Sequence, residues 1–168
     1  MLRLNLATDY GLRVLLYLAH CPDRAASTVE VAEFYRISAD HVRKVARQLA
    51  QAGYLRTDRG RNGGLRLNRL PGEIRVGDVV QLLEGPPALL ECVLREDVCV
   101  VQPGCRLRRL LAEAGEQMLA TLRGVTLADL VPPTEELVAL ASEPPPGPGA
   151  ATSAPRGPGW LPDGSAPP

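Results

Sequence analysis

A glycine-rich stretch in the first half of the chain constrains the fold more than any other feature. Residues 54–57 and 65–67 alternate apolar and polar side chains, and between them lies the run Asp58-Arg59-Gly60-Arg61-Asn62-Gly63-Gly64. Its Asn-Gly-Gly part supplies the positive φ angles that a tight turn needs, so the segment predicts a β-hairpin. The arginines of the run would project from the tip towards a phosphate backbone or a minor groove.

Two helical patterns begin the chain. Apolar residues predict a largely buried helix from Thr8 to about Ala19, with Thr8 or Asp9 as its cap. The run Ser27-Thr28-Val29-Glu30 has the form of a capping box. It predicts a short second helix that ends at about Tyr35.

A third helix is expected to carry basic and amide side chains on its outer face. Ser38 is its candidate cap, and a buried apolar stripe runs from Val42 to Leu49 before Gly53 ends the helix. Three helices followed by a hairpin predict a winged helix-turn-helix, whose third helix enters the major groove. Arg, Lys and Gln suit phosphates and base edges. The candidate DNA contacts are Ser38, His41, Arg43, Lys44, Arg47, Gln48, Arg59, Arg61 and Asn62.

Charge is distributed unevenly along the chain. Residues 36–70 hold nine basic and two acidic side chains, a net +7, although the whole chain has a formal net charge of zero. Because field strength depends on local charge, this segregation is typical of a phosphate-binding face on an otherwise acidic protein. A solvated arginine-rich surface on an ordinary α+β module is the alternative.

The remaining chain is expected to be helical, which gives a mostly α fold with one small β-hairpin. Aromatic residues make up 4% of the chain, and this favours aliphatic helix packing. Helices are predicted over Ile74–Leu83, about Gly104–Arg123, Thr126–Leu130 and about Thr134–Ala141. The longest is amphipathic, and we assign it to homodimerisation because such motifs read paired half-sites on double-stranded operator DNA. Packing of this helix onto its own domain is the alternative.

Three cysteines lie between two of the predicted helices, at Cys92, Cys99 and Cys105. Three thiolates within fourteen residues can converge on one metal centre, and in a reducing compartment they favour metal binding or redox sensing over disulfides. His20 and His41 lie far earlier in the chain, so a closed zinc site has no obvious fourth ligand. Soft thiolates with an incomplete shell suit an iron-sulfur cluster. Such a cluster is also compatible with an electron carrier, but an electron carrier has no use for a basic helix and a wing.

Five segments resemble the Rrf-type winged-helix repressors and, within that family, the nitric-oxide-sensing NsrR repressors. They cover roughly residues 1–131, and the wing motif followed by three cysteines is highly specific. The segments are Ala7–Arg13, Ala52–Tyr54, Arg59–Leu67, Ile74–Val80 and Thr126–Leu130.

The resemblance implies a homodimer with one cluster in each subunit. The cluster-bound form would bind operator DNA and repress transcription, and nitric oxide would nitrosylate the cluster and release the DNA. A 4Fe-4S cluster is usual in the NsrR-like group. Asp9 matches a position that can supply an oxygen ligand from the partner subunit, although a helix cap is an equal alternative for Asp9.

Two departures from the family pattern bear on the cluster. Six residues separate Cys92 from Cys99, at least one more than the family leads us to expect. Relatives that regulate iron-sulfur biogenesis carry a histidine ligand three residues after the last cysteine, where this chain has Arg108. This favours a 4Fe-4S cluster over a histidine-ligated 2Fe-2S cluster. An iron-sulfur-homeostasis or redox-sensing regulator of the same fold remains the alternative.

The sequence therefore predicts four parts: a winged helix-turn-helix over 1–83, a cluster-binding loop over 84–106, dimerisation and C-terminal helices over 107–142, and a disordered Pro/Gly-rich tail over 143–168. No apolar run approaches the ~18 residues of a membrane span, and the start lacks a signal-peptide pattern, so we expect a cytoplasmic protein. The sequence shows no nucleophile–base pair or P-loop, so we expect no enzymatic role.

Overall fold

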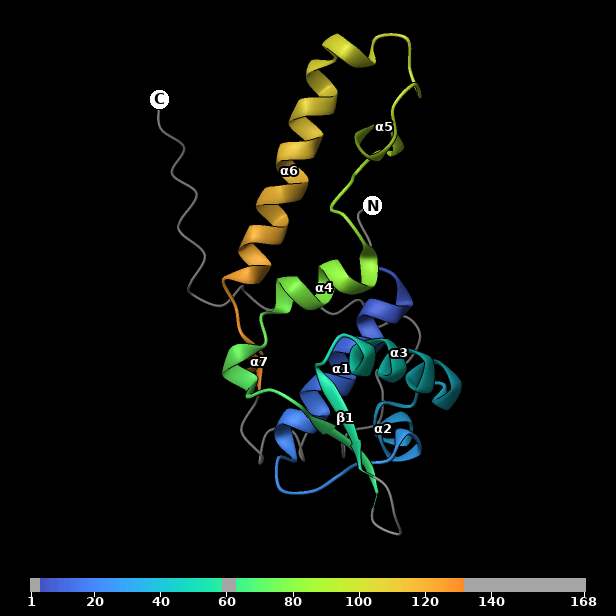
Figure 1. Cartoon of the computed structure of the whole chain (residues 1–168), viewed down its shortest axis with the longest axis vertical. Coiled ribbons are helices and arrows are strands. Elements are labelled where there is room, and N and C mark those ends of the chain that lie inside the picture. The colour runs from blue at the N-terminus through green and yellow to red at the C-terminus, as the bar shows by residue number, and fades with distance from the viewer. Residues whose placement is uncertain (1–3, 59–62, 132–168) are drawn as a thin grey trace, which may run out of the picture.

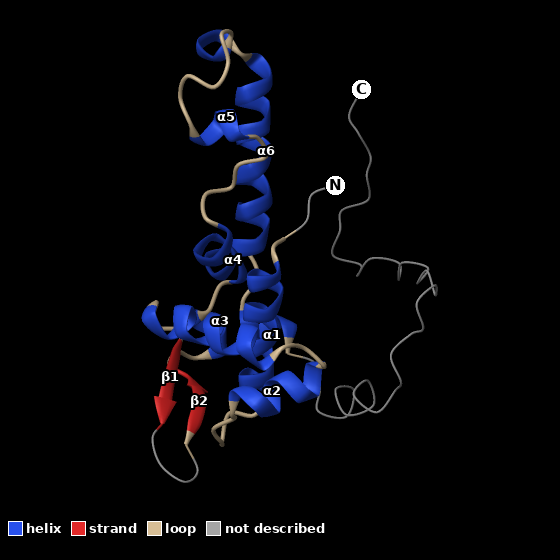
Figure 2. Ribbon diagram, turned by 90° about the vertical axis from the view of Figure 1, so that its right-hand side faces the viewer, coloured by secondary structure: helices blue, strands red, loops and turns tan. Residues whose placement is uncertain are grey.

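The computed structural model describes residues 4–58 and 63–131. It confirms a mostly helical chain with one antiparallel hairpin (Figures 1 and 2). The elements are α1 (Leu6–His20), α2 (Thr28–Tyr35), α3 (Ala39–Gln51), β1 (Leu55–Asp58), β2 (Gly64–Leu67), the 3-10 turn η1 (Pro71–Glu73), α4 (Val76–Glu84), α5 (Glu91–Leu94), the 3-10 turn η2 (Gln102–Gly104), α6 (Arg106–Arg123) and α7 (Leu127–Leu130).

The sequence predicted the N-terminal cap of α2 correctly but not that of α1. Asn5 caps α1, because its Oδ1 accepts a hydrogen bond from the Thr8 amide at 2.9 Å. The helix therefore begins earlier than predicted, and the prediction of Thr8 or Asp9 as the cap was wrong. The predicted capping box of α2 is confirmed: Ser27 Oγ accepts from the Glu30 amide, and the Glu30 carboxylate accepts from the Ser27 amide.

The first three helices enclose the core on which the rest of the fold is built. α1 packs against α3 and α4, and α2 packs against α3. The predicted stripe of α3 is buried, with Val42 and Leu49 fully inaccessible to solvent. Aliphatic side chains from these helices, together with Leu55 and Leu65 of the hairpin, form one continuous hydrophobic cluster.

The two strands of the hairpin pair with each other, and the hairpin is also hydrogen-bonded to the segment that connects α1 and α2. β1 pairs with β2 with Leu55 opposite Leu67 and Thr57 opposite Leu65. Leu65 also exchanges two backbone hydrogen bonds with Ala26, at 3.1 and 2.8 Å. A Cβ on Gly64 would lie 2.7 Å from the Ala26 carbonyl oxygen, so glycine permits this close approach. The predicted tip contacts Arg59, Arg61 and Asn62 lie outside the described residues.

After the hairpin, η1 leads into α4, which begins at Val76 and not at Ile74 as predicted. Ile74 lies before the helix because its carbonyl accepts a hydrogen bond from the Leu127 amide at 2.8 Å, which ties α7 to this segment. Thr126 is the N-cap of α7, as predicted, and its amide and hydroxyl both donate to the Asp129 carboxylate. The helix expected near 134–141 and the C-terminal tail lie outside the described residues.

α6 packs on α4 near its C-terminal end and extends away from the rest of the molecule at its other end (Figures 1 and 2). At this joint, two glycines allow α6 to pack closely against α4 and against the linker that follows α4. A Cβ on Gly77 of α4 would lie 2.6 Å from the Arg123 backbone nitrogen, and a Cβ on Gly115 of α6 would lie 2.3 Å from the Pro87 carbonyl oxygen. The predicted long helix is therefore confirmed, and part of it packs back onto its own chain.

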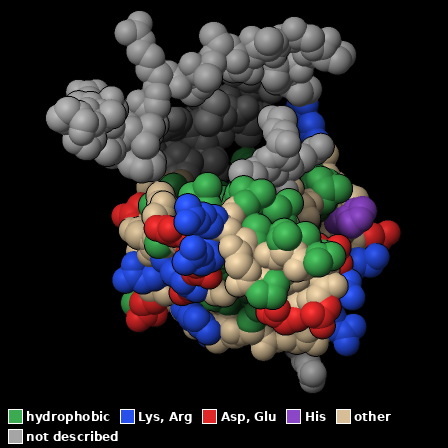
Figure 3. All heavy atoms as spheres, turned by 90° about the horizontal axis from the view of Figure 1, so that it is seen from above, with side chains coloured by type: hydrophobic (Ala, Val, Ile, Leu, Met, Phe, Trp, Pro, Cys, Tyr) green, Lys and Arg blue, Asp and Glu red, His purple; other side chains and the backbone are tan. Residues whose placement is uncertain are grey.

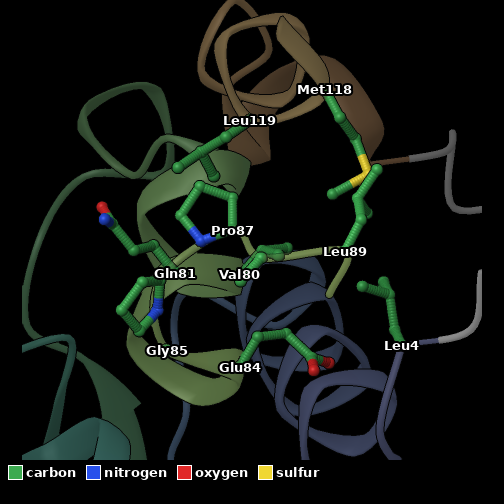
Figure 4. Close-up of a pocket in the computed structure, with 11 residues that line it drawn as sticks. Leu4, Val80, Gln81, Glu84, Gly85, Pro87, Leu89, Met118 and Leu119 are labelled. Atoms are coloured by element: carbon green, nitrogen blue, oxygen red, sulfur yellow. The ribbon is translucent and has the colours of Figure 1, made fainter. Parts of the chain in front are cut away.

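A mainly apolar pocket of about 230 Å³ lies at the same joint (Figure 4). Val80 comes from α4, Pro87 and Leu89 from the following linker, Met118 and Leu119 from α6, and Leu4 from the start of the chain. Among the described residues, no helix is both long and apolar enough to cross a membrane.

Candidate nucleic-acid interface and cysteine loop

The outer face of α3 carries the predicted DNA contacts at the surface. His41, Arg43, Lys44, Arg47 and Gln48 are all exposed, on the side opposite the buried stripe. Such a row of donors on a protruding helix can reach base edges and phosphates in a major groove. The α3 residues that the sequence singled out for DNA binding therefore share one accessible face.

A shallow hollow lies where this face meets the start of α1. It is lined by Ala7, Tyr10, His41, Lys44, Val45, Arg47 and Gln48. The Tyr10 ring meets the His41 ring edge-on, with centroids 5.9 Å apart, so Tyr10 packs against a predicted DNA contact. Nothing in the sequence pattern points to Tyr10, because it meets His41 only through the packing of α1 on α3.

The local environments of Arg43 and Ser38 bear on what these two predicted DNA contacts can do. The Arg43 guanidinium is ion-paired with the Asp40 carboxylate one turn earlier, so its charge is partly neutralised before any phosphate arrives. Ser38 occupies the N-cap position of α3 and is exposed, but in the described structure its side chain makes no capping hydrogen bond. Its predicted position as the N-cap is therefore confirmed, without a side-chain bond to the helix.

The base of the hairpin adds positive charge beside α3. Arg66 bonds Asp58 at 2.8 Å, and Arg56 lies 3.8 Å from the same carboxylate. One acidic group thus sits between two arginines, and the segment keeps a net positive charge. The position of the hairpin beside α3, visible in Figure 2, suits contact with the DNA backbone next to the groove.

The three loop cysteines lie between α4 and the N-terminus of α6, as predicted. Cys92 is half-buried on α5, Cys99 is exposed in the following turn, and Cys105 is the half-buried N-cap of α6. The Cys105 Sγ accepts a hydrogen bond from the Arg108 amide at 3.4 Å. Cys105 thus stands at the positive end of the α6 dipole.

The donor chemistry of the loop fits an iron-sulfur cluster, but the chain alone does not gather the thiols. Within 4–58 and 63–131, no three His, Cys, Asp or Glu side chains lie close enough together to hold a metal ion. The expected convergence of the three cysteines is therefore not seen. Metal binding and folding are commonly coupled, so a metal centre can draw its ligands together.

Asp9 and Arg108 have specific partners. The Asp9 carboxylate accepts a hydrogen bond from Arg13 at 2.8 Å, one turn later in α1, and its side chain is partly exposed. It does not cap the helix, because Asn5 does. The Arg108 guanidinium bonds Glu96 of the cysteine loop at 2.8 Å. Arg108 therefore anchors the loop to α6 at the position where a histidine ligand would otherwise stand.

The end of the molecule that carries the cysteine loop exposes apolar side chains. Val100 is 99% exposed, and Leu107 and Leu110 of α6 are 56% and 61% exposed. Viewed from that end, hydrophobic side chains gather in the middle of the face, with charged side chains around them (Figure 3). A concentration of large apolar residues at a protein surface commonly marks an interaction site.

Comparison with known proteins decides the class of this chain. The family model described as Rrf2, iron-dependent transcriptional regulator, matches residues 4–133. The chain belongs to the Rrf2 family. It is a transcriptional regulator rather than an enzyme, and members of this family bind DNA.

Solved structures agree with this assignment. The Rrf2 chain is similar to CymR, the global cysteine regulator of B. subtilis, with 27% identity, a TM-score of 0.64, and 78% of this chain and 97% of that chain covered. It is also similar to T. potens IscR, with 27% identity, a TM-score of 0.61 and coverages of 77% and 85%. A protein of Listeria innocua matches at 30% identity and a TM-score of 0.61, with coverages of 76% and 85%. The Rrf2 winged-helix fold is thereby confirmed.

Proposed function

We propose that this Rrf2 protein is a homodimeric repressor whose affinity for operator DNA depends on an iron-sulfur cluster held by Cys92, Cys99 and Cys105. One observation carries the proposal: the cysteine loop joins α4, which packs on the DNA-binding core, to α6, which extends away from it. A change at the thiols therefore acts on one of the links between the two parts, at the end of α6 that lies away from its packing on α4.

The DNA-binding side of the proposal rests on α3 and the hairpin. Two copies of the exposed α3 face would enter successive major grooves, with each hairpin on the adjacent backbone. A single winged helix contacts about half the length that useful specificity needs, and this favours a dimer on paired half-sites. The net +7 of residues 36–70 supplies the electrostatic part of the affinity.

The dimer itself is supported by the apolar surface of α6. Leu107, Leu110 and Met118 are large apolar residues that remain exposed in the single chain. They lie on the helix that extends from the core, where a second α6 can approach without disturbing the first three helices. We assign this surface to the partner subunit.

The cluster completes the proposed switch. Three thiolates bind three of the four irons, which leaves one iron free to take another ligand. Asp9 of the partner subunit is the proposed oxygen donor to that iron. Asp9 would have to exchange its bond to Arg13 for this role. The proposed signal is nitric oxide, which reacts with iron-sulfur clusters. Loss of the cluster would loosen the loop and, with it, the fixed spacing of the two α3 helices.

An iron-sulfur-homeostasis or redox-sensing regulator of the same fold is the second candidate, and the similarity to T. potens IscR favours it. Arg108 argues against a histidine-ligated 2Fe-2S centre, because a guanidinium stays protonated and offers no lone pair to iron. We therefore propose a 4Fe-4S cluster. An electron-carrier role is disfavoured by membership of a family of transcriptional regulators.

The test compares cysteine variants of the full chain, purified without oxygen. Operator DNA is obtained by selecting duplexes from a randomised library with the wild-type protein. Alanine at Cys92, Cys99 or Cys105 should remove bound iron and weaken binding to the selected duplex by ~5- to 150-fold, the usual range of allosteric coupling.

Two controls sharpen that test. Cys21 lies at the end of α1, away from the loop, so Cys21→Ala should leave both the iron content and the DNA affinity unchanged. Arg47→Ala should weaken DNA binding and flatten its salt dependence while the iron content stays unchanged. A colourless triple-cysteine variant that binds the duplex with wild-type affinity would refute the switch.

A further inference from the structure

Gln102 makes the most extensive polar contacts of any side chain in the cysteine loop. It lies in η2, and its side chain is buried, with 4% of the residue exposed to solvent. A buried amide is costly unless all its hydrogen-bonding groups are satisfied. The sequence alone does not single out Gln102, because one glutamine between two cysteines forms no recognisable motif.

The amide of Gln102 bonds both sides of the loop at once. Its Nε2 donates to the carbonyl oxygens of Cys92 at 2.9 Å and Arg95 at 2.5 Å. Its Oε1 accepts from the backbone amides of Val98 at 2.9 Å and Cys99 at 3.4 Å. Glutamine has two donors and an acceptor oxygen with two lone pairs, so this arrangement uses the full capacity of the side chain.

The main chain of Gln102 extends the same network to the third cysteine. Its amide donates to the Cys99 carbonyl at 3.0 Å, and its carbonyl accepts from the Cys105 amide at 3.3 Å. Gln102 is therefore hydrogen-bonded to the backbone of Cys92, Cys99 and Cys105.

This arrangement explains how a loop with little regular structure keeps a defined shape. α5 is a single turn, and its last carbonyls lack helical partners beyond it. Gln102 satisfies the Cys92 and Arg95 carbonyls from outside the helix. Asp97, with a φ of 60°, then turns the chain back towards η2.

We propose that Gln102 is the positioning residue of the cysteine loop: its side chain and main chain together fix the backbones of the three cysteines relative to one another, so that a metal centre has only to draw the thiols together from an ordered loop. The last clause rests on the proposed function. The ordering of the loop by Gln102 does not, because it acts in the cluster-free chain.

Two substitutions separate the halves of the network. Gln102→Leu has a similar size and removes every side-chain hydrogen bond. Gln102→Glu keeps acceptor oxygens for Val98 and Cys99 but loses the donors to Cys92 and Arg95. Gln117→Leu is the matched control, since Gln117 is exposed on α6 and its side chain bonds Glu113, one turn away.

The first measurement uses the full-length, reduced, cluster-free protein. Amide hydrogen exchange of residues 92–105 and iodoacetamide alkylation of each cysteine are followed by mass spectrometry. Gln102→Leu should speed both by about tenfold or more, because these amides then exchange through local opening. Gln102→Glu should restore protection at Val98 and Cys99 while Cys92 stays more reactive than in the wild type. A general loss of stability would not produce this asymmetry.

The second measurement follows cluster retention. Protein reconstituted with iron and sulfide is challenged with a chelator, and the visible absorbance is recorded. Groups that orient metal ligands typically change affinity by ~10- to 100-fold when replaced, so Gln102→Leu should lose its cluster faster by a factor in that range.

The outcomes distinguish this proposal from the proposed function. Suppose that Gln102→Leu speeds exchange and alkylation as predicted, but the wild-type protein takes up no iron. This result would uphold the role of Gln102 and refute the cluster. A wild-type cluster together with unchanged exchange and alkylation in Gln102→Leu would overturn the role of Gln102 and leave the cluster standing.

Discussion

The two halves of this Rrf2 chain are stabilised in different ways. From α1 to α4, aliphatic side chains of several helices and the hairpin bury one another in a continuous core. From α5 to α6, the loop is held by the polar network of Gln102, and the buried residues of α6, among those described, are Gly115 and Leu119. The first half forms this core together with Leu127 of α7, whereas the second presents apolar side chains and thiols at its surface.

This difference shows where regulation can act. A core of close-packed aliphatic residues responds little to a small signal, because its stability is spread over many contacts. A loop held by a few hydrogen bonds opens locally at low cost. The placement of the cysteines in the weakly held half therefore allows a ligand at the thiols to change the geometry of the α6 end without unfolding the DNA-binding half.

The largest effect is expected from truncation in the core. Leu49→Ala removes a fully buried side chain from α3 and should lower the free energy of unfolding by about 3 kcal/mol, the usual cost of such a cavity. Leu110→Ala, at an exposed position on α6, is the matched control and should change it by less than about 0.5 kcal/mol when the chain is monomeric. Urea unfolding at low protein concentration measures both. Equal losses would erase the contrast between the halves.

The next effect concerns self-association. Leu110→Glu places a charge on the apolar face of α6 and should weaken dimerisation by about 2 kcal/mol or more, as expected for a central interface residue. Sedimentation velocity over a concentration series would show dissociation, while the unfolding midpoint of the monomer stays unchanged. A variant that dimerises like the wild type would remove α6 from the interface.

A smaller effect is expected at the joint between the halves. Gly115→Ala would bring a Cβ to 2.3 Å from the Pro87 carbonyl oxygen, so the linker must shift, at a cost of about 1 kcal/mol or more. Gly72→Ala is the control, since nothing among the described atoms lies within 4 Å of a Cβ there. Limited proteolysis should cut the 85–89 linker faster in Gly115→Ala alone. Equal cleavage of both variants would show that the joint is not closely packed.

The smallest effect is a pH-dependent ion pair in the DNA-binding half. A hydrogen bond from Arg24 holds the pKa of Glu30 below its ordinary value of 4.5. A carboxyl whose pKa is lowered in the folded chain stabilises the fold at pH values above its ordinary pKa. This stabilisation is lost as the pH falls through the lowered pKa of the folded chain. Glu30→Gln should therefore cost less than about 1 kcal/mol at pH 7, because the pair is partly exposed.

The measurement for this ion pair is urea unfolding of wild type and Glu30→Gln at pH 7 and pH 4. The difference between them should shrink at the lower pH, because the Glu30 carboxyl of the unfolded chain takes up a proton before that of the folded chain does. Glu33→Gln, on the exposed side of the same helix, should show no such trend. A difference that grows towards low pH would contradict the assignment.

The sequence predicted the architecture well because its signals are local. The capping box of α2, the stripe of α3 and the alternating strands around Asn-Gly-Gly each depend on residues within a few positions. The boundaries of α1 and α4 were less accurate. Asn5 was overlooked as a cap, and Ile74 lies outside α4 because of a bond to α7, 53 residues later in the chain.

The candidate site was predicted only in part, since its geometry depends on contacts between distant segments. The outward face of α3 follows from helical periodicity and was found. Tyr10 reaches His41 only because α1 packs on α3. Gln102 matters through four backbone atoms of the loop that no residue pattern encodes.

The proposed switch requires that a cluster on the cysteine loop controls DNA binding. The most direct test is to purify the full chain without oxygen, assay iron and sulfide, and follow the absorption spectrum and binding to the selected duplex during titration with nitric oxide. We expect about four irons and four sulfides per subunit, and loss of DNA binding as the cluster spectrum disappears. A protein that binds the duplex without iron, or that keeps its DNA affinity after the cluster has reacted, would contradict it.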